Sequence, residues 1–371
     1  LFLLISILPI GNFGLKYLEN NYINQQEISN IENIIVLAGS EDIQSTKVTK
    51  KLNLNSGSER LIASVKLANE FKNAKIFFLG GDGNLIKNSA ENFHVLRLAH
   101  FRHVQLLHGE SDKGASSSKV TRAYDQIAVS GQRAIDRYKE NGVNFADSQL
   151  RIIGRPVTDS IDVAKGVKPV QTILYAPTWE GHERASDFCS LRNIAVPTIT
   201  WLLDNKPEIK IIIKPHPLTG TNDSELIGIL ETLKNLVTDI GKHGNNQAER
   251  ISTSPFHQFL EPANRISIYK LFNEVDGLIC DNSSVASDFL VSTKPMFICD
   301  SRNEGEDVLR SKYPVAKGSY VINADPNSLF NCKEGFESDP LKAKRIEIAQ
   351  YILGDFDGSA TDQFHLLLQG K

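Results

Sequence analysis

The chain has 371 residues, of which 41% are hydrophobic and 23% charged, and its formal net charge is −3. That length exceeds what one hydrophobic core usually serves, so we expect two domains. The slight acidic excess argues against a general nucleic-acid-binding protein. The four cysteines, Cys189, Cys280, Cys299 and Cys332, lack C-x-x-C spacing. This spacing disfavours a zinc site or a disulfide framework and fits a reducing compartment.

The first 20 residues begin with a largely apolar run, LFLLISILPIGNFGL. This run is too short to span a bilayer. We interpret residues 1–20 as the remnant of a membrane anchor, which fits a protein that works at a membrane surface. The alternative is an amphipathic helix buried in the protein.

From residue 33 onward, β-branched apolar runs alternate with helical patterns. Strands are expected at 33–40, 74–84, 103–109, 124–131 and 150–156, and helices at 58–73 and 131–142. In the first of these helices Leu61, Val65 and Ala68 share one face, and Ser58 stands where an N-cap is needed. Alternation of this kind builds parallel sheets.

A polar stretch at 160–171 predicts a linker, and a second α/β series follows it. Its strands are expected at 172–177, 209–217, 265–272 (part of which is compatible with a helix), 275–281 and 294–300, and its helices at 194–204, 224–238 and 284–291. We therefore predict an α/β fold with two Rossmann-like, doubly wound lobes and a cleft between them.

Ligands of open parallel sheets bind beyond the carboxyl ends of the strands. Four polar clusters occupy such positions: HGESDKG from His108, TWEGHE at 178–183, KPHP at 214–217 and DNSS at 281–284. In KPHP, the prolines stiffen the turn, so that Lys214 and His216 can face an anion with little loss of entropy. The alternative is an ordinary turn with a surface histidine.

The segment DNSSVASDFL reads as a junction between a strand and a helix. Ser283 and Ser284 would lie at the helix N-terminus, where free N–H groups and the helix dipole favour a phosphate. Simple N-capping by Ser283 is the alternative. Trp179 would either stack on a nucleobase or pack in the core.

His108 directly ends an apolar strand and precedes a glycine. A histidine in this position is the best candidate in the chain for a general base near neutral pH. The alternative is a solvated turn, in which Glu110, Asp112 and Lys113 are ordinary surface residues.

Taken in order, the motifs resemble those of the CDP-glycerol glycerophosphotransferase family of teichoic-acid polymerases and primases. The resemblance covers residues 92–330 and rests on HGESDKG, YDQIAVSGQRAIDRY, IIGRP, YAPTW, KPHP and DNSSVASDFL. It implies a GT-B arrangement, with an acceptor-side lobe in 91–162 and a nucleotide-donor lobe in 170–371. It also implies transfer of glycerol phosphate, or a related polyol phosphate, from a CDP carrier to a hydroxyl of a lipid-linked acceptor, with release of CMP at the cytoplasmic face of the bacterial cell membrane.

The resemblance also implies roles for individual residues. His108 would deprotonate the acceptor hydroxyl, and His216 would contact the donor phosphates. The donor phosphates and glycerol would be held by the residues of the D-x-S-S…D segment, namely Asp281, Ser283, Ser284 and Asp288. Thr178 would lie near the cytidine. Phosphoryl-type transfer often uses Mg²⁺, but no acidic cluster in the sequence demands a metal.

Two departures from the family pattern leave questions open. The form LHGESDKG, in place of an aromatic-led HGT, indicates a divergent subgroup and leaves the acceptor and the polyol open. Residues 30–90 resemble instead the YdcF-like (SanA/ElyC-type) envelope family, with a seam near 84–92. A natural fusion, a chimera or a divergent first lobe would each produce this pattern, and we favour a chimera or recombinant fusion.

Two other functions stay open on the sequence. One is a GT-B glycosyltransferase that uses a sugar nucleotide to build capsule or envelope polysaccharide. The other is a chimeric envelope protein without catalytic activity.

Overall fold

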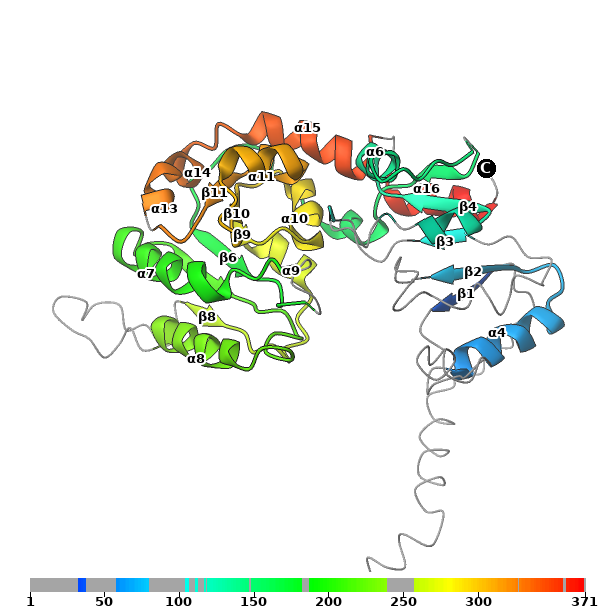
Figure 1. Ribbon diagram of the computed structural model, residues 1–371, viewed down its shortest axis with the longest axis horizontal. Helices are drawn as coiled ribbons and strands as arrows, with labels where there is room; N and C mark the ends of the chain where they lie inside the picture. Colours follow the sequence, from blue (N-terminus) through cyan, green and yellow to red (C-terminus); the bar gives the residue numbers. More distant parts are fainter. Residues whose placement is uncertain are drawn as a thin grey trace, which may run out of the picture.

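The computed structural model describes residues 33–37, 58–79, 104–106, 111–112, 117, 119–146, 148–181, 187–238, 257–325, 327–355 and 358–369. The apolar N-terminal segment, the expected seam at 84–92 and His108 lie outside this part of the chain. The described residues form two parallel sheets that lie side by side (Figure 1). None of the helices in the described part is both long and apolar enough to cross a membrane.

The first sheet follows the chain order, β1-β2-β3-β4-β5, with all neighbours parallel. Its strands are β1 (Asn33–Leu37), β2 (Lys75–Leu79), β3 (Val104–Leu106), β4 (Gln126–Val129) and β5 (Leu150–Ile152). The helices α4 (Ser58–Glu70) and α6 (Gln132–Glu140) belong to two of the crossovers. Because β2 pairs with β3, the sheet is continuous across the expected seam.

The second sheet has the order β11-β10-β9-β6-β7-β8 and is also parallel. Its strands are β6 (Thr172–Ala176), β7 (Lys210–Ile213), β8 (Gln258–Phe259), β9 (Gly277–Cys280), β10 (Met296–Cys299) and β11 (Tyr320–Ile322). The chain builds outward from β6 on one side and then from β9 on the other. The strand order therefore reverses between β6 and β9, the position at which doubly wound sheets bind ligands.

Both faces of the second sheet are covered by helices, which explains why its strands read as continuous apolar runs. Ile173, Ile211 and Ile279 face one core, which is closed by a π-helical turn (Leu191–Ala195) and the helices α7 (Val196–Asn205), α8 (Glu225–Thr238), α13 (Asn327–Asn331) and α14 (Lys333–Glu337). Leu174 and Leu278 face the other core, which is closed by the helices α9 (Ile268–Glu274), α10 (Ser284–Phe289), α11 (Glu306–Lys312), α12 (Pro314–Lys317) and α15 (Lys342–Leu353) and the 3₁₀ turn η6 (Leu290–Ser292).

The end of the chain returns to the first sheet. Leu367 of α16 (Ala360–Gln369) packs with Val104 and Leu106 of β3. Asp159, in the 3₁₀ turn η3 (Pro156–Ser160), accepts hydrogen bonds from the backbone N–H of Ala360 (3.0 Å) and Thr361 (2.8 Å) and so caps α16. Residues 360–369, which the sequence groups with the second lobe, thus pack on the first (Figure 1).

Two local predictions were wrong. The segment 265–272, expected as a strand with a part compatible with a helix, forms no strand and contains most of α9, in which Leu271 and Phe272 are buried. In α4 the side chain of Val65 is 43% exposed, whereas Ser64 is buried. The spacing of apolar residues identified a shared face of this helix but not the rotation at which the helix packs.

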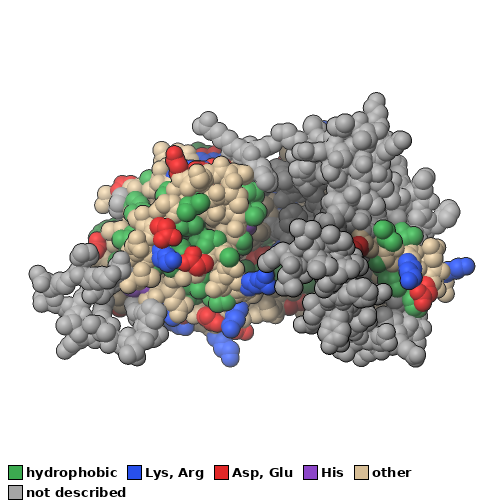
Figure 2. All heavy atoms as spheres, turned by 90° about the horizontal axis from the view of Figure 1, so that it is seen from below, with side chains coloured by type: hydrophobic (Ala, Val, Ile, Leu, Met, Phe, Trp, Pro, Cys, Tyr) green, Lys and Arg blue, Asp and Glu red, His purple; other side chains and the backbone are tan. Residues whose placement is uncertain are grey.

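On the face shown in Figure 2, acidic and basic side chains of the described residues are interspersed over the lobe at the left. This mixture agrees with the small net charge of the chain.

Candidate functional site

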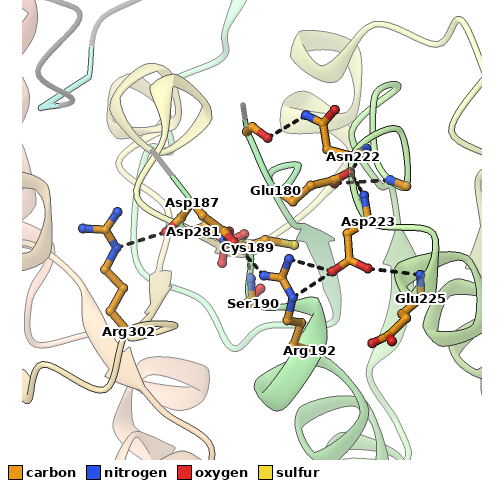
Figure 3. Close-up of polar contacts among 12 residues, drawn as sticks. Glu180, Asp187, Cys189, Ser190, Arg192, Asn222, Asp223, Glu225, Asp281 and Arg302 are labelled. Atoms are coloured by element: carbon orange, nitrogen blue, oxygen red, sulfur yellow. Dashed lines mark hydrogen bonds and ion pairs between the residues drawn. The ribbon is translucent and has the colours of Figure 1, made fainter. Parts of the chain in front are cut away.

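The carboxyl ends of β6 and β9 are tied together by one buried carboxylate. Asp281 Oδ2 accepts hydrogen bonds from the backbone N–H groups of Thr178 (2.7 Å) and Ser190 (3.3 Å). Its side chain is fully buried, and a buried charge persists only where it has such partners. Asp281, which follows β9, therefore holds both ends of the loop after β6 at the point where the strand order reverses (Figure 3).

The KPHP turn follows β7, next to this point. Lys214 Nζ donates to the carbonyl oxygen of Asn264 (3.2 Å), and burial lowers the pKa of Lys214. His216 Nδ1 accepts from the N–H of Leu218 (3.1 Å), so Nε2 carries the proton and is the donor of the ring. His216 is half-buried rather than fully exposed.

Trp179 lies in the loop after β6, opposite His216. Their ring centroids are 5.9 Å apart and the ring planes differ by 17°, so the two rings stack. Trp179 is half-buried at the edge of the site, and its indole faces the histidine.

The junction between β9 and α10 presents buried donors. Ser283 occupies the N-cap position of α10, but its hydroxyl makes no capping hydrogen bond. Within the described part of the chain, Ser283 Oγ and Asn282 Nδ2 have no hydrogen-bond partner, although these residues are only 8% and 3% exposed. N-capping by the Ser283 side chain is therefore the wrong explanation of this residue, while Ser284 is half-buried beside it.

Asp288 binds Arg155, which lies at the beginning of the segment that connects the two lobes. Its carboxylate forms two hydrogen bonds with Arg155, from Nε (2.5 Å) and Nη2 (3.0 Å), and a third with the hydroxyl of Tyr269 (3.0 Å). Burial would lower the pKa of Arg155, but Asp288 outweighs it and raises that pKa. Arg155 belongs to the IIGRP motif, so this motif fixes α10 from across the linker. A role of Asp288 toward the donor stays a prediction.

The loop after β10 completes this edge of the sheet. Asp300 accepts from the N–H groups of Glu304 (3.0 Å) and Gly305 (2.8 Å). The Arg302 guanidinium lies 3.7 Å from the ring centroid of Phe188, and its Nε donates to the Asp187 carbonyl oxygen (3.0 Å) (Figure 3). The sequence prediction did not include Arg302. The same rule, applied to the residues after the strand expected at 294–300, would have found it.

In the first lobe, the loop after β3 is anchored to α6. Asp112 Oδ1 accepts from Arg133 Nε (2.6 Å) and lies 3.5 Å from Arg137 Nη1. The Asp112 side chain is 7% exposed, so the alternative in which Asp112 is an ordinary surface residue is wrong. Further along the loop, Ser117 is buried and accepts from the Asn141 side chain (2.8 Å). His108, Glu110 and Lys113 lie outside the described residues.

Two parallel α/β lobes with a crossing C-terminal helix, and polar loops at the switch point of the second sheet, are the features of the GT-B fold. In the described regions, no three His, Cys, Asp or Glu side chains gather as a group that could hold a metal ion. The chain belongs to the CDP-glycerol:poly(glycerophosphate) glycerophosphotransferase family, whose sequence profile matches residues 46–305. That match begins inside the segment expected to be YdcF-like, and the comparisons do not show the YdcF-like resemblance.

Two of the similar solved structures have TM-scores above 0.5 and share this fold at low identity. The S. aureus MnaA–UDP co-structure is 13% identical, with a TM-score of 0.51 over 89% of this chain and 81% of that chain. A putative UDP-N-acetylglucosamine 2-epimerase from Listeria monocytogenes is 10% identical, with a TM-score of 0.54 over 92% and 96%. The wall teichoic acid polymerase TagF is 13% identical, with a TM-score of 0.48 over 98% of each chain. No curated protein matches the chain.

Proposed function

We propose that this protein transfers glycerol phosphate from CDP-glycerol to a hydroxyl of a teichoic-acid-type acceptor and releases CMP. The family supplies the reaction class. The observation that carries the assignment is a set of donors at the ends of the two strands that pair with β6. The Lys214 ammonium and the His216 Nε2–H follow β7, and the buried donors of Asn282 and Ser283, which lack partners among the described residues, follow β9. Buried polar groups normally find partners, and phosphate oxygens would supply acceptors.

The reaction forms one bond and breaks one. The acceptor oxygen attacks the phosphorus that carries glycerol, the new P–O bond forms, and the bond from this phosphorus to the CMP oxygen breaks. The hydroxyl proton passes to a base, and CMP departs with the electron pair. Lys214 and His216 would stabilise the charge that develops on the departing phosphate, because both are held in place before the reaction begins.

His108 is the base in this proposal, because it occupies the position of the histidine in the first family motif. The buried ion pair between Asp112 and Arg133 supports the assignment, since it anchors the same loop four residues after His108. We further propose that the acceptor is lipid-linked and that the protein works at the cytoplasmic face of the membrane. Activity that requires vesicles carrying the acceptor would support this location, and equal activity on a soluble acceptor fragment would argue against it.

The decisive assay measures CMP release from CDP-glycerol in the presence of a lipid-linked acceptor. We expect His108→Ala and His216→Ala to abolish release, because one removes the base and the other a phosphate contact. The matched control is His365→Ala, which removes an exposed histidine on α16, far along the chain from both loops. Full activity in either test variant would refute the assignment.

Ligand-induced stabilisation separates this function from a sugar-nucleotide glycosyltransferase. Binding to the folded state alone raises the melting temperature with ligand concentration. We expect CDP-glycerol, CDP and CMP to stabilise the protein. Stabilisation by UDP-sugars and none by the cytidine ligands would favour the glycosyltransferase, and a panel of CDP-polyols would identify the polyol.

A further inference from the structure

We propose that Glu180 is a positioning residue for His216. The proposal rests on the proposed function only in that His216 is taken to contact the donor. Glu180 is buried, and both of its carboxylate oxygens accept hydrogen bonds from backbone N–H groups of the protein. It directly follows Trp179, whose ring stacks on His216.

The Glu180 carboxylate is surrounded by backbone N–H groups of the loop after β7 (Figure 3). Oε1 accepts from Asn222 (2.8 Å) and Asp223 (3.1 Å), and Oε2 accepts from Gly220 (3.2 Å). Burial would raise the pKa of Glu180, but the backbone hydrogen bonds outweigh it and lower that pKa. The carboxylate is therefore ionised at neutral pH, and its hydrogen bonds are charge-assisted.

A second kind of hydrogen bond joins the loops after β6 and β7, with the donor and acceptor loops exchanged. The Asn222 side-chain amide donates to the Gly181 carbonyl oxygen at 2.7 Å. Gly220 has a φ of +86°, a conformation that other residues rarely adopt, and a Cβ there would lie 2.8 Å from Ile227 Cγ1. The path of this loop is thus set by local backbone geometry and by Glu180 together.

One short turn connects Gly220, which donates to Glu180, with His216. The N–H of Thr219 donates to the His216 carbonyl oxygen (3.0 Å), and the N–H of Leu218 donates to His216 Nδ1 (3.1 Å). Residues 216–219 therefore form a closed turn that ends where Glu180 binds. Two consecutive residues of the loop after β6 contact this turn. Trp179 stacks on the His216 ring, and Glu180 accepts from the backbone N–H of Gly220, directly after the turn.

The emission of Trp179 tests this contact without any substrate. Trp179 and Trp201 are the two tryptophans of the chain, so Trp201→Phe leaves Trp179 as the single reporter. In this background we expect the imidazole of His216, which stacks on the indole, to quench the emission at neutral pH, and His216→Gln to remove the quenching. Glu180→Ala should weaken this quenching strongly, and Glu180→Gln should weaken it partly, because the amide keeps one carbonyl oxygen but turns a donor toward an N–H group.

Kinetics then test the consequence for the reaction. Misplacement of a group by about 1 Å reduces turnover on the order of 10²-fold. We expect Glu180→Ala to lower kcat by about this factor, with a much smaller change in KM for CDP-glycerol, and Asn222→Ala to have a smaller effect in the same direction. The control is Asp159→Ala, which also removes a carboxylate bound to two backbone N–H groups, at α16. It should lower the melting temperature while leaving Trp179 quenching and kcat unchanged.

Unchanged quenching in Glu180→Ala and Glu180→Gln would overturn the proposal, and so would an unchanged kcat beside a loss of quenching. If Glu180→Ala does not fold, Glu180→Gln and Asn222→Ala carry the test. If the wild-type protein releases no CMP, the proposed function fails, and the emission experiment still decides whether Glu180 positions His216.

Discussion

Replacing Asp288 by alanine should destabilise the protein by about 3–5 kcal/mol, the loss typical when one partner of a buried ion pair is removed. The Arg155 and Asp288 side chains are only 10% and 3% exposed, so solvent cannot replace the lost carboxylate. Three hydrogen bonds end on Asp288, two from Arg155 and one from Tyr269. An exposed ion pair would contribute about 0–1 kcal/mol instead.

The measurement is urea unfolding, read as the change of midpoint at constant slope. Tyr269→Phe is the graded control, because it removes one hydrogen bond to a charged group and should lower the free energy of unfolding by about 1.5–3 kcal/mol. The double variant Arg155→Met/Asp288→Leu should recover much of the loss, since no buried charge is left without its partner.

The same variant separates two roles for Asp288. The family resemblance implies a contact with the donor, whereas the geometry shows a contact with the interlobe segment. If Asp288→Ala loses less than about 1 kcal/mol, as an exposed pair would, and raises KM for CDP-glycerol, then Asp288 serves the donor and its structural role is refuted.

Three further results are expected. Burial lowers the pKa of Lys214, and donor phosphates would favour its charged form, so donor binding at alkaline pH should take up a proton. Calorimetry in two buffers of different ionisation enthalpy measures this proton uptake, and Lys214→Met should remove the uptake. Asp112→Ala should lower the free energy of unfolding by about 3 kcal/mol in thermal or urea unfolding, because two buried arginines of α6 lose a carboxylate. A decrease in the free energy of unfolding no larger than that of an exposed pair would show that burial does not strengthen this contact. The pKa of Glu180 is lowered from 4.5, so its stabilising effect is full at pH values above 4.5 and is lost as the pH falls through the folded-state pKa. Glu180→Gln should therefore reduce the dependence of the free energy of unfolding on pH at acid pH. An unchanged dependence would show that Glu180 contributes nothing to stability in this range.

The sequence determined the alternation of strands and helices and the place where chemistry gathers. The runs expected at 172–177 and 275–281 became β6 and β9, because strands covered on both faces must be apolar throughout. The rule that ligands lie beyond strand ends selected KPHP and DNSS, and both lie at the carboxyl edge of the second sheet. At 265–272 the sequence left a strand and a helix open, because a short apolar run fits both, and the fold forms a helix that buries Leu271 and Phe272.

Only the tertiary structure decided what each polar side chain at this edge does. Asp281 holds backbone N–H groups, Asp288 pairs with an arginine 133 positions away, and Asp112 pairs with α6. Sequence spacing cannot distinguish such carboxylates from ligand-binding ones, because both follow strands and both are polar. Whether a carboxylate meets solvent, substrate or a distant cation depends on which segments the fold brings beside it, and that depends on the order of the strands and on the path of the chain between the lobes.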